Sequence, residues 1–535
     1  MRILRAALLL VAFDAGALCL AVGGDSTAIQ PVTANASPEV RAVLQMLHDI
    51  SGKYTLTGQH NYPNTKSRNS EFAAKYTGKT PAIFASDWGF AKTGDTDSYL
   101  ARPDIVQEMI RQYRRGSLVD TCWHAVPPTA DEPVTFRPQP DSDPNRLASV
   151  QGQLTDEQFK DLLTPGRPIY EHWCSQVDAI AVFLKQLQDA HVPVLWRPYH
   201  EMNGEWFWWG GRVGQYSTAA LYRQLFDRLV NHHHLNNLIW VWSMDRVDRP
   251  AREHAQYFPG INYVDVLALD VYHNDFGKAY YDSLVSLSQG KPLALDEVGN
   301  PPAPEILEKQ PLWTYYGIWG GMVRNTSRKD YAVLMQNPRM LGLDDPAYWS
   351  VMAPVRAASG LPPLHFKPAS ADLSGQVRSQ PRARAASEHV ALAPGDFSGS
   401  WVLNEDKSDL GKMGAGFAPA RLDVVQHGND LTIRSTRTIE YGDDQTTEDK
   451  LTLDGAESKS VFMNSPRVTT AKLSADLRQL EIDSTVSITW GEPGSKIIMK
   501  DTWTLNDRGD ALTIGRFSST PFMGEQRQTL VFDQR

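Results

Sequence analysis

Several features that would place this 535-residue chain in a familiar class are missing. The net charge is -9, and no basic stripe interrupts the sequence, so we expect no nucleic-acid partner. The fourteen histidines are dispersed without the spacing of zinc ligands, so we expect no metal site. No long apolar run occurs after residue 23, which argues against a membrane span. These absences leave a globular protein of unremarkable charge.

Cysteine is also scarce, with three copies, one of them inside the N-terminal segment. Residues 1–23 read as a secretory signal peptide, because Arg2 and Arg5 precede an apolar run that ends in small residues. We therefore expect a secreted or periplasmic protein. If the segment is removed, Cys122 and Cys174 remain. They could form one disulfide in an oxidising compartment or stay as two buried thiols.

The chain is too long for one ordinary core, and its hydrophobic pattern divides it into two domains. Within residues 38–365, short apolar strands alternate with helical stretches. Eight such repeats are the signature of a (β/α)8 TIM barrel, so the fold class is α/β. The expected strands are residues 54–57, 81–85, 118–122, 192–196, 238–242, 264–269, 292–295 and 316–320.

A change of composition marks the end of this domain. Residues 366–394 are small, polar and proline-bearing, which is typical of a linker. Residues 395–535 then follow a period of two without a helix of useful length, so we expect an all-β domain of about eight to ten antiparallel strands, either a small barrel or a sandwich. Its start, Gly399-Ser400-Trp401, is similar to that of lipocalin-like barrels. A closed TIM barrel has no free edge to complete, so the two domains should fold independently.

Residues 194–210 join a buried strand to a polar and then aromatic segment. Indole rings such as those of Trp206 and Trp209 stack on the apolar faces of pyranose rings. A core strand followed by a hydrophobic helix would explain these tryptophans. It would not explain why Arg197, His200 and Glu201 gather at the strand end. The segment therefore predicts a sugar-cleaving site.

Two glutamates can supply the chemistry of that site. Glu201 ends the fourth predicted strand and Glu297 the seventh, so a closed barrel brings both to the same mouth. Glycoside hydrolysis with retention needs two carboxyl groups about 5 to 5.5 Å apart. Glu201 lies beside the tryptophans, and such burial raises the pKa of a general acid. Glu297 is then the nucleophile, although alone it could be a helix N-terminal carboxylate.

Other strand-end residues are candidate partners of these two acids. Tyr272 ends the sixth predicted strand and would donate a hydrogen bond to Glu297. His200 is expected to bind a sugar hydroxyl or the nucleophile. Arg197 either fixes a carboxylate of the site or forms a structural ion pair under the barrel mouth. Trp319 lies near the end of the eighth predicted strand.

The chain resembles glycoside hydrolase family 26, the β-mannanase family, over about residues 40–360. Residues 197–210 are similar to the acid/base region of that family, and residues 296–299 to its nucleophile segment. Residues 123–124, 263–272 and 319 are similar to its third-, sixth- and eighth-strand segments. The resemblance implies that Glu201 is the acid/base and Glu297 the nucleophile. It also implies that the substrate is bound by His124, Arg197, His200, Trp206, Trp209, Tyr272 and Trp319.

The same resemblance implies retaining chemistry without a cofactor. It favours an endo-acting β-1,4-mannanase that binds β-mannan or a related polysaccharide. We also expect a monomer. Mixed-linkage β-glucanase, β-1,3-xylanase and exo-mannobiohydrolase activities belong to the same family and stay open as alternatives. A non-catalytic glycan-binding protein is the alternative of a different class, and the presence of both acids argues against it.

Overall fold

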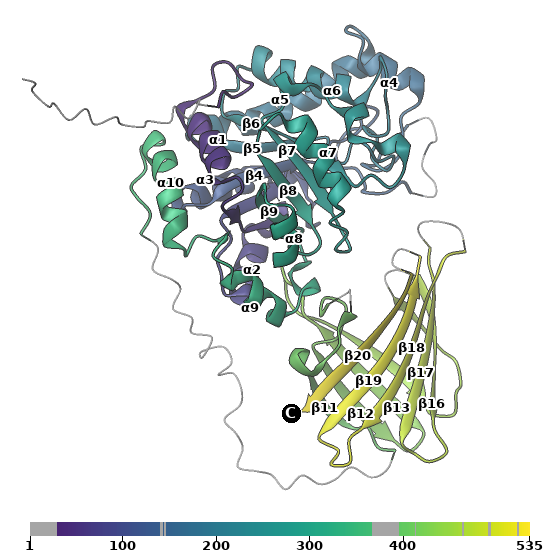
Figure 1. Ribbon diagram of the computed structural model, residues 1–535. Coiled ribbons are helices and arrows are strands. Elements are labelled where there is room, and N and C mark those ends of the chain that lie inside the picture. Colours follow the sequence, from purple (N-terminus) through teal and green to yellow (C-terminus); the bar gives the residue numbers. More distant parts are fainter. Residues whose placement is uncertain are drawn as a thin grey trace, which may run out of the picture.

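The computed structural model divides the chain into a parallel α/β barrel and a separate antiparallel β domain (Figure 1). Both parts of the expected fold class are confirmed. The predicted signal peptide and linker lie outside the residues that the structure describes. Those residues are 29–535 except 140–142, 144–145, 366–394, 412–413, 463–464, 490–493 and 522–523.

Eight parallel strands form the closed barrel: β2 (Gly58–Asn61), β3 (Ile83–Asp87), β4 (Leu118–Trp123), β5 (Val194–Pro198), β6 (Leu238–Asp245), β7 (Val266–Val271), β8 (Leu293–Val298) and β9 (Trp313–Ile318). The sheet closes because β9 pairs with both β8 and β2. A Cβ on Gly58 would lie 2.2 Å from the Tyr316 carbonyl oxygen, so this closure requires glycine. Beside the barrel, the short strand β1 (Thr55–Leu56) pairs with β9, and β10 (Met340–Leu341) pairs with β1.

Helices pack around this barrel: α1 (Pro38–Ile50), α2 (Arg68–Thr77), α3 (Arg102–Arg115), α4 (Asp156–Leu162), α5 (Pro168–Asp189), α6 (Thr218–Phe226), α7 (Lys278–Ser288), α8 (Pro304–Lys309), α9 (Arg328–Gln336) and α10 (Pro346–Ala358). Their starts follow the sequence: the Ser37 hydroxyl accepts the Val40 N–H, and Thr155 and Gln158 form a reciprocal capping box. The apolar faces of α1, α3 and α5 are buried against the strands, as helical spacing predicts.

Two barrel strands differ from their expected positions. We predicted residues 54–57 as the first strand, but they overlap β1, and the strand that pairs with β3 and β9 is β2. The eighth strand differs as well. We predicted residues 316–320, whereas β9 spans Trp313–Ile318 and Trp319 follows it. Residues 312–320 are apolar or aromatic except for one threonine and two glycines, so their pattern does not define where the strand begins. The Trp319 N–H still donates to the Val298 carbonyl at 2.9 Å, which holds Trp319 at the barrel mouth.

The C-terminal domain, yellow-green in Figure 1, is one antiparallel meander. Its strands are β11 (Gly399–Leu403), β12 (Arg421–His427), β13 (Asp430–Arg437), β14 (Gln445–Thr452), β15 (Ser458–Phe462), β16 (Ser465–Leu473), β17 (Gln479–Ser487), β18 (Lys496–Leu505), β19 (Ala511–Thr520) and β20 (Gly524–Gln534). Because consecutive strands reverse direction, their connections alternate between two ends of the domain. The β11–β12 and β13–β14 connections lie at the end that meets the TIM barrel.

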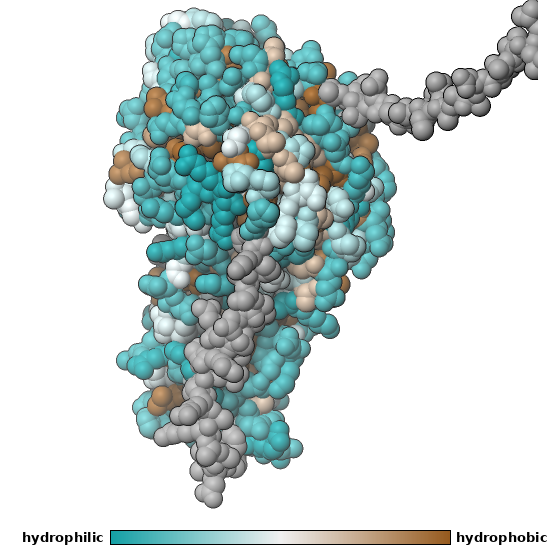
Figure 2. Space-filling view, turned by 90° about the vertical axis from the view of Figure 1, so that its left-hand side faces the viewer, coloured by the Kyte–Doolittle hydropathy of each residue, from teal (hydrophilic) through white to brown (hydrophobic). Residues whose placement is uncertain are grey.

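Each domain has its own hydrophobic core. The barrel core includes Trp196 and Trp240, whereas Trp401 and Trp503 are buried in the β domain. Among the described residues no hydrophobic cluster includes side chains of both domains, which are joined by hydrogen bonds and a ring contact. The face in Figure 2 is mainly hydrophilic, with hydrophobic residues in small scattered patches. Independent folding of the two domains stays a prediction.

None of the helices in the described part of the chain has the length and apolar character needed to cross a bilayer.

Candidate active site

The two predicted acids meet at the mouth of the barrel, at the C-terminal ends of the strands. Glu297 lies in β8, and Glu201 follows β5, which ends at Pro198. Tyr199 and Glu201 both have φ of 50°, in the left-handed region that side chains disfavour. This turn is stabilised by a 3.0 Å hydrogen bond from the Glu201 N–H to the Ser243 carbonyl of β6. Strained backbone of this kind is common at functional sites.

Glu297 is held by two donors. Arg197 Nη2 donates to its Oε2 at 2.9 Å, and the Tyr272 hydroxyl donates to Oε1. Arg197 is also paired with Asp270 at 3.0 Å and is 2% exposed. Donors on both oxygens fix the orientation of this carboxyl group, as a positioned nucleophile requires. Arg197 therefore combines the two roles that the sequence left open, because it is a buried ion pair and it fixes a site carboxylate.

Glu201 has the opposite environment. Its side chain is buried, and this desolvation raises its pKa well above the ordinary value. The negative charge of Glu297 raises the Glu201 pKa further, whereas a 2.7 Å hydrogen bond from Trp206 Nε1 lowers it. The two carboxyl groups thus lie in different environments. The raised pKa suits Glu201 to hold a proton, as a general acid must.

A substitution at Trp206 offers a direct test of the Glu201 pKa. Replacing Trp206 by Phe keeps an aromatic ring and removes the N–H that stabilises the Glu201 carboxylate. We expect the Glu201 pKa to rise. A general acid works below its pKa and is lost as the pH rises through it. The alkaline limb of kcat/KM should therefore move to higher pH in a profile measured on an oligosaccharide substrate.

The matched control is Trp349→Phe on α10, where the indole donates to the Leu343 carbonyl at 2.7 Å, away from the barrel mouth. This variant should keep the wild-type pH profile. A limb in Trp206→Phe that is unmoved or moves to lower pH would contradict the proposed influence of Trp206 on Glu201.

His200 lies deep beside the acids. Burial lowers its pKa well below the ordinary value, and the charge of Arg197 adds to this, so its ring is neutral. The ring centroid is 4.5 Å from that of His124. Trp209 is fully buried behind it and donates from Nε1 to the His200 carbonyl at 2.9 Å. The structure thus places Trp209 as a support for His200 instead of on the cleft surface where we expected it to bind sugar.

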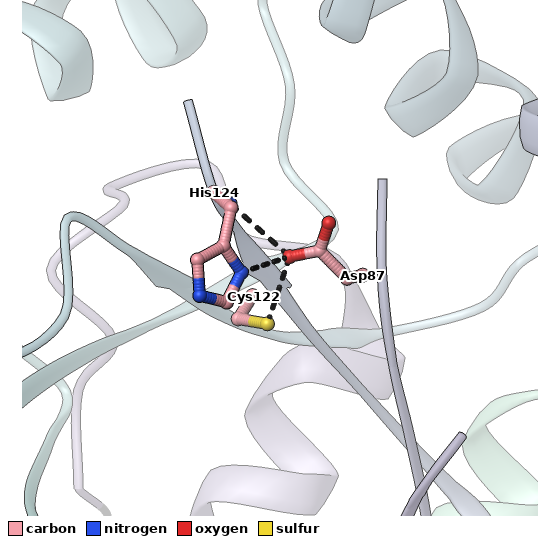
Figure 3. Close-up of side chains that lie close together, drawn as sticks. All are labelled: Asp87, Cys122 and His124. Atoms are coloured by element: carbon pink, nitrogen blue, oxygen red, sulfur yellow. Dashed lines mark hydrogen bonds and ion pairs between the residues drawn. The ribbon is translucent and has the colours of Figure 1, made fainter. Parts of the chain in front are cut away.

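His124 is oriented by Asp87, as Figure 3 shows. One carboxylate oxygen of Asp87 accepts from His124 Nδ1 at 2.8 Å, from the His124 N–H at 3.1 Å and from Cys122 Sγ at 3.0 Å. Burial alone would lower the pKa of His124, but the charge and hydrogen bond of Asp87 outweigh it and raise the pKa. With Nδ1 occupied, Nε2 is the nitrogen that can meet a sugar hydroxyl.

The same three side chains could in principle hold a metal ion, since their ligand atoms lie within 4.8 Å of one another. Each ligand atom is already used in the hydrogen bonds to Asp87, which fits a group that positions His124. Cys122 and Cys174 are both free, buried thiols.

Trp319 lies against a residue that the sequence reasoning did not assign to the site. Its ring stacks on His60, with centroids 3.9 Å apart and an interplanar angle of 18°. Burial lowers the pKa of His60 to about 3, so the ring is neutral. We predicted no function for His60, Asp87 or Asp270 from the sequence, although each lies at or near the end of a barrel strand. Their position at strand ends was the available signal.

Comparison with known proteins agrees with this geometry. The model of Glycosyl hydrolase family 26 matches residues 32–337. A mannan endo-1,4-beta-mannosidase of Thermothelomyces thermophilus is 33% identical over 302 residues, which cover 55% of this chain and 57% of that protein. Mannan endo-1,4-beta-mannosidase B of Piromyces sp. is 27% identical over 304 residues, 54% of this chain and 48% of that protein. The chain thus spans about half the length of these curated relatives.

Among solved structures, GH26A from Muricauda sp. is similar to this chain, with 40% identity and a TM-score of 0.54. The match covers 58% of this chain and 98% of the Muricauda chain. The C-terminal β domain lies outside the family match. Because the family model covers more than half of the sequence and includes both buried glutamates, this chain belongs to glycoside hydrolase family 26.

Proposed function

We propose that this chain is an endo-acting β-1,4-mannanase that cleaves its substrate with retention. The observation that carries the proposal is the contrast between its two glutamates. Glu201 is buried beside Trp206 with a raised pKa, whereas Glu297 accepts hydrogen bonds from Arg197 and Tyr272. A carboxyl group that donates a proton and a second one that attacks as the nucleophile are the two requirements of double displacement.

In the first step the Glu297 carboxylate attacks the anomeric carbon, and the bond to the leaving oxygen breaks. Glu201 gives its proton to that oxygen, so the departing sugar leaves as an alcohol. Glu297 is now a neutral ester, and its charge no longer raises the pKa of Glu201. The Glu201 carboxylate can therefore take a proton from water. That water attacks the anomeric carbon and releases Glu297.

The names of the relatives support mannan as the substrate class. Side chains at the mouth fit a pyranose. Trp206 and Trp319 offer aromatic faces that are half-buried, and His124 offers a ring nitrogen for a hydroxyl. The His200 ring packs edge-on against the His124 ring, with centroids 4.5 Å apart.

The test is hydrolysis of galactomannan, glucomannan, mixed-linkage glucan and β-1,3-xylan by the full chain. We expect cleavage of the two mannans, with oligosaccharides of several lengths among the early products. Preferred cleavage of mixed-linkage glucan or β-1,3-xylan would replace the proposed substrate. Release of mannobiose alone from the outset would replace endo by exo action. Binding without hydrolysis would leave a glycan-binding protein.

We also propose that the protein is exported to the periplasm or the medium. The support is the sequence of residues 1–23, with two arginines before an apolar run. The mature protein from the native host should start close after residue 23, as N-terminal sequencing can determine. A cell-associated protein that retains Met1 would overturn this.

A further inference from the structure

The loop after β9, residues 319–327, is held from the side of the C-terminal domain. Glu440, in the β13–β14 connection, is buried and accepts from two backbone donors of this loop. The Val323 N–H donates to Oε2 at 3.0 Å, and the Arg324 N–H donates to Oε1 at 2.8 Å. The loop also contains Trp319. A residue of the β domain is therefore hydrogen-bonded to the segment that carries an aromatic side chain of the active site.

The β11–β12 connection also binds this loop. The Ala415 N–H donates to the Arg324 carbonyl at 2.8 Å. The Arg324 guanidinium, which is 4% exposed, pairs with Glu405 at 3.3 Å. Glu405 also accepts from the Tyr76 hydroxyl at 2.8 Å. A buried polar or charged group that lacks a partner costs free energy. The two domains must therefore fit closely where these groups meet.

The residue next to Glu440 continues the aromatic surface of the barrel. Tyr441 packs edge-on against Tyr62, with ring centroids 4.9 Å apart, and Tyr62 packs edge-on against Trp319 at 6.3 Å. The Tyr62 hydroxyl donates to the Gly320 carbonyl at 3.1 Å. A Cβ on Gly321 would lie 3.2 Å from the Tyr441 ring, so this ring lies directly over the loop backbone. Three rings thus run from the active site onto the second domain.

A carboxylate accompanies these rings. The Asn64 N–H donates to the Thr96 carbonyl at 3.0 Å, which holds Asp97 near Tyr62. Burial raises the pKa values of Tyr62 and Tyr441, and the charge of Asp97 raises both further. Tyr441 and Asp97 are each only half-buried, so both retain a surface that faces solvent. Aromatic faces beside a carboxylate are the ordinary chemistry of pyranose recognition. Tyr441 is also the one tyrosine between residues 395 and 535.

We propose that the C-terminal domain completes the sugar-binding cleft. Tyr441, with Tyr62 and Asp97, forms an additional binding position for a β-linked hexopyranose beyond Trp319, and Glu440 is the positioning residue that holds this position against the barrel. The inference rests on the proposed hydrolysis of a polysaccharide. It assigns to the β domain a direct part in substrate binding, whereas the sequence predicted only that this domain folds independently of the barrel.

The experiment compares Tyr441→Ala with wild type in the full chain, on β-1,4-mannohexaose and on the shortest manno-oligosaccharide that wild type cleaves. Loss of one stacked ring should lower kcat/KM on the hexaose about 3- to 10-fold. The short substrate, which leaves the outer position empty, should be cleaved at the wild-type rate. Tyr441→Phe keeps the ring and should stay close to wild type on both.

Two further variants separate sugar binding from structural support. Glu440→Ala frees the loop that carries Trp319 and should lower kcat/KM on both substrates. Leu477→Ala is the control, because this exposed side chain lies in a connection at the opposite end of the β domain. It should change neither value. Thermal unfolding of each variant shows whether the fold is retained.

Each outcome is decisive. Equal losses on both substrates in Tyr441→Ala would make Tyr441 a packing residue and overturn the proposed position. No loss on either substrate would overturn it as well, while the proposed mannanase activity would stand. A wild-type chain that cleaves none of the oligosaccharides would refute the mannanase activity and, with it, the extra position.

Discussion

Replacing Glu297 by Ala should lower kcat on mannan by about four orders of magnitude or more. Removal of a nucleophile blocks the covalent path, and losses of this size or larger are common for such variants. The change also leaves Arg197 and the Tyr272 hydroxyl without their shared acceptor. The measurement is the initial rate of reducing-end release, with protein concentration high enough to detect residual turnover.

Adding sodium azide to the Glu297→Ala variant then tests whether Glu297 is the nucleophile. The space left by the carboxylate admits a small anion, which can attack the anomeric carbon from the side of residue 297 and yield an α-glycosyl azide from an activated β-mannoside. Glu308→Ala is the control, since this exposed glutamate lies on α8, just after β8. It should retain full activity. Azide products of β configuration, or wild-type early products of α configuration by NMR, would sink the nucleophile assignment.

Replacing Glu201 by Ala should affect substrates unequally. A leaving sugar needs a proton, so kcat on mannan should fall by about 10² to 10⁴-fold. A 2,4-dinitrophenyl β-glycoside needs none, and its first step should keep nearly the wild-type rate. The buried environment that raises the Glu201 pKa makes it the proton donor in this account. Comparison of the two substrates by single-turnover kinetics measures the contrast.

Glu201→Gln provides the matched variant, because it keeps the size and the Trp206 hydrogen-bond acceptor but holds no acidic proton. It should show the same contrast between substrates. If both substrates lost activity to the same extent in both variants, Glu201 would be a binding residue and another group would have to supply the proton.

The sequence predicted the barrel and the position of its acids for one physical reason. Fully buried parallel strands are continuous apolar runs, and their ends are where polar residues first become tolerable. Glu297 and Tyr272 could therefore be placed at the mouth before their hydrogen bond was known. The alternating pattern after residue 397 identified the second domain for a similar reason, since one face of each strand is buried.

Two features could not be predicted in this way. Trp206 and Trp209 lie three residues apart in one aromatic run, yet only Trp206 is partly exposed. The positive φ angles at Tyr199 and Glu201 interrupt the regular backbone of this segment. Residue spacing therefore does not show which of the two rings points inward. The second feature is the contact between Glu440 and the loop at Val323. It joins residues 117 positions apart, and in the sequence Glu440 belongs to an ordinary polar turn.

The even number of strands in the C-terminal meander fixes where its two termini emerge. β11 begins and β20 ends at the end of the domain opposite the connections that contact the barrel. At that end the Arg535 N–H donates to the Ser400 carbonyl. Any appendage joined after residue 535 would thus project away from the catalytic mouth. Attachment of the enzyme to a solid support through this terminus would leave the cleft facing the bulk solution, an orientation decided by the parity of the strand count.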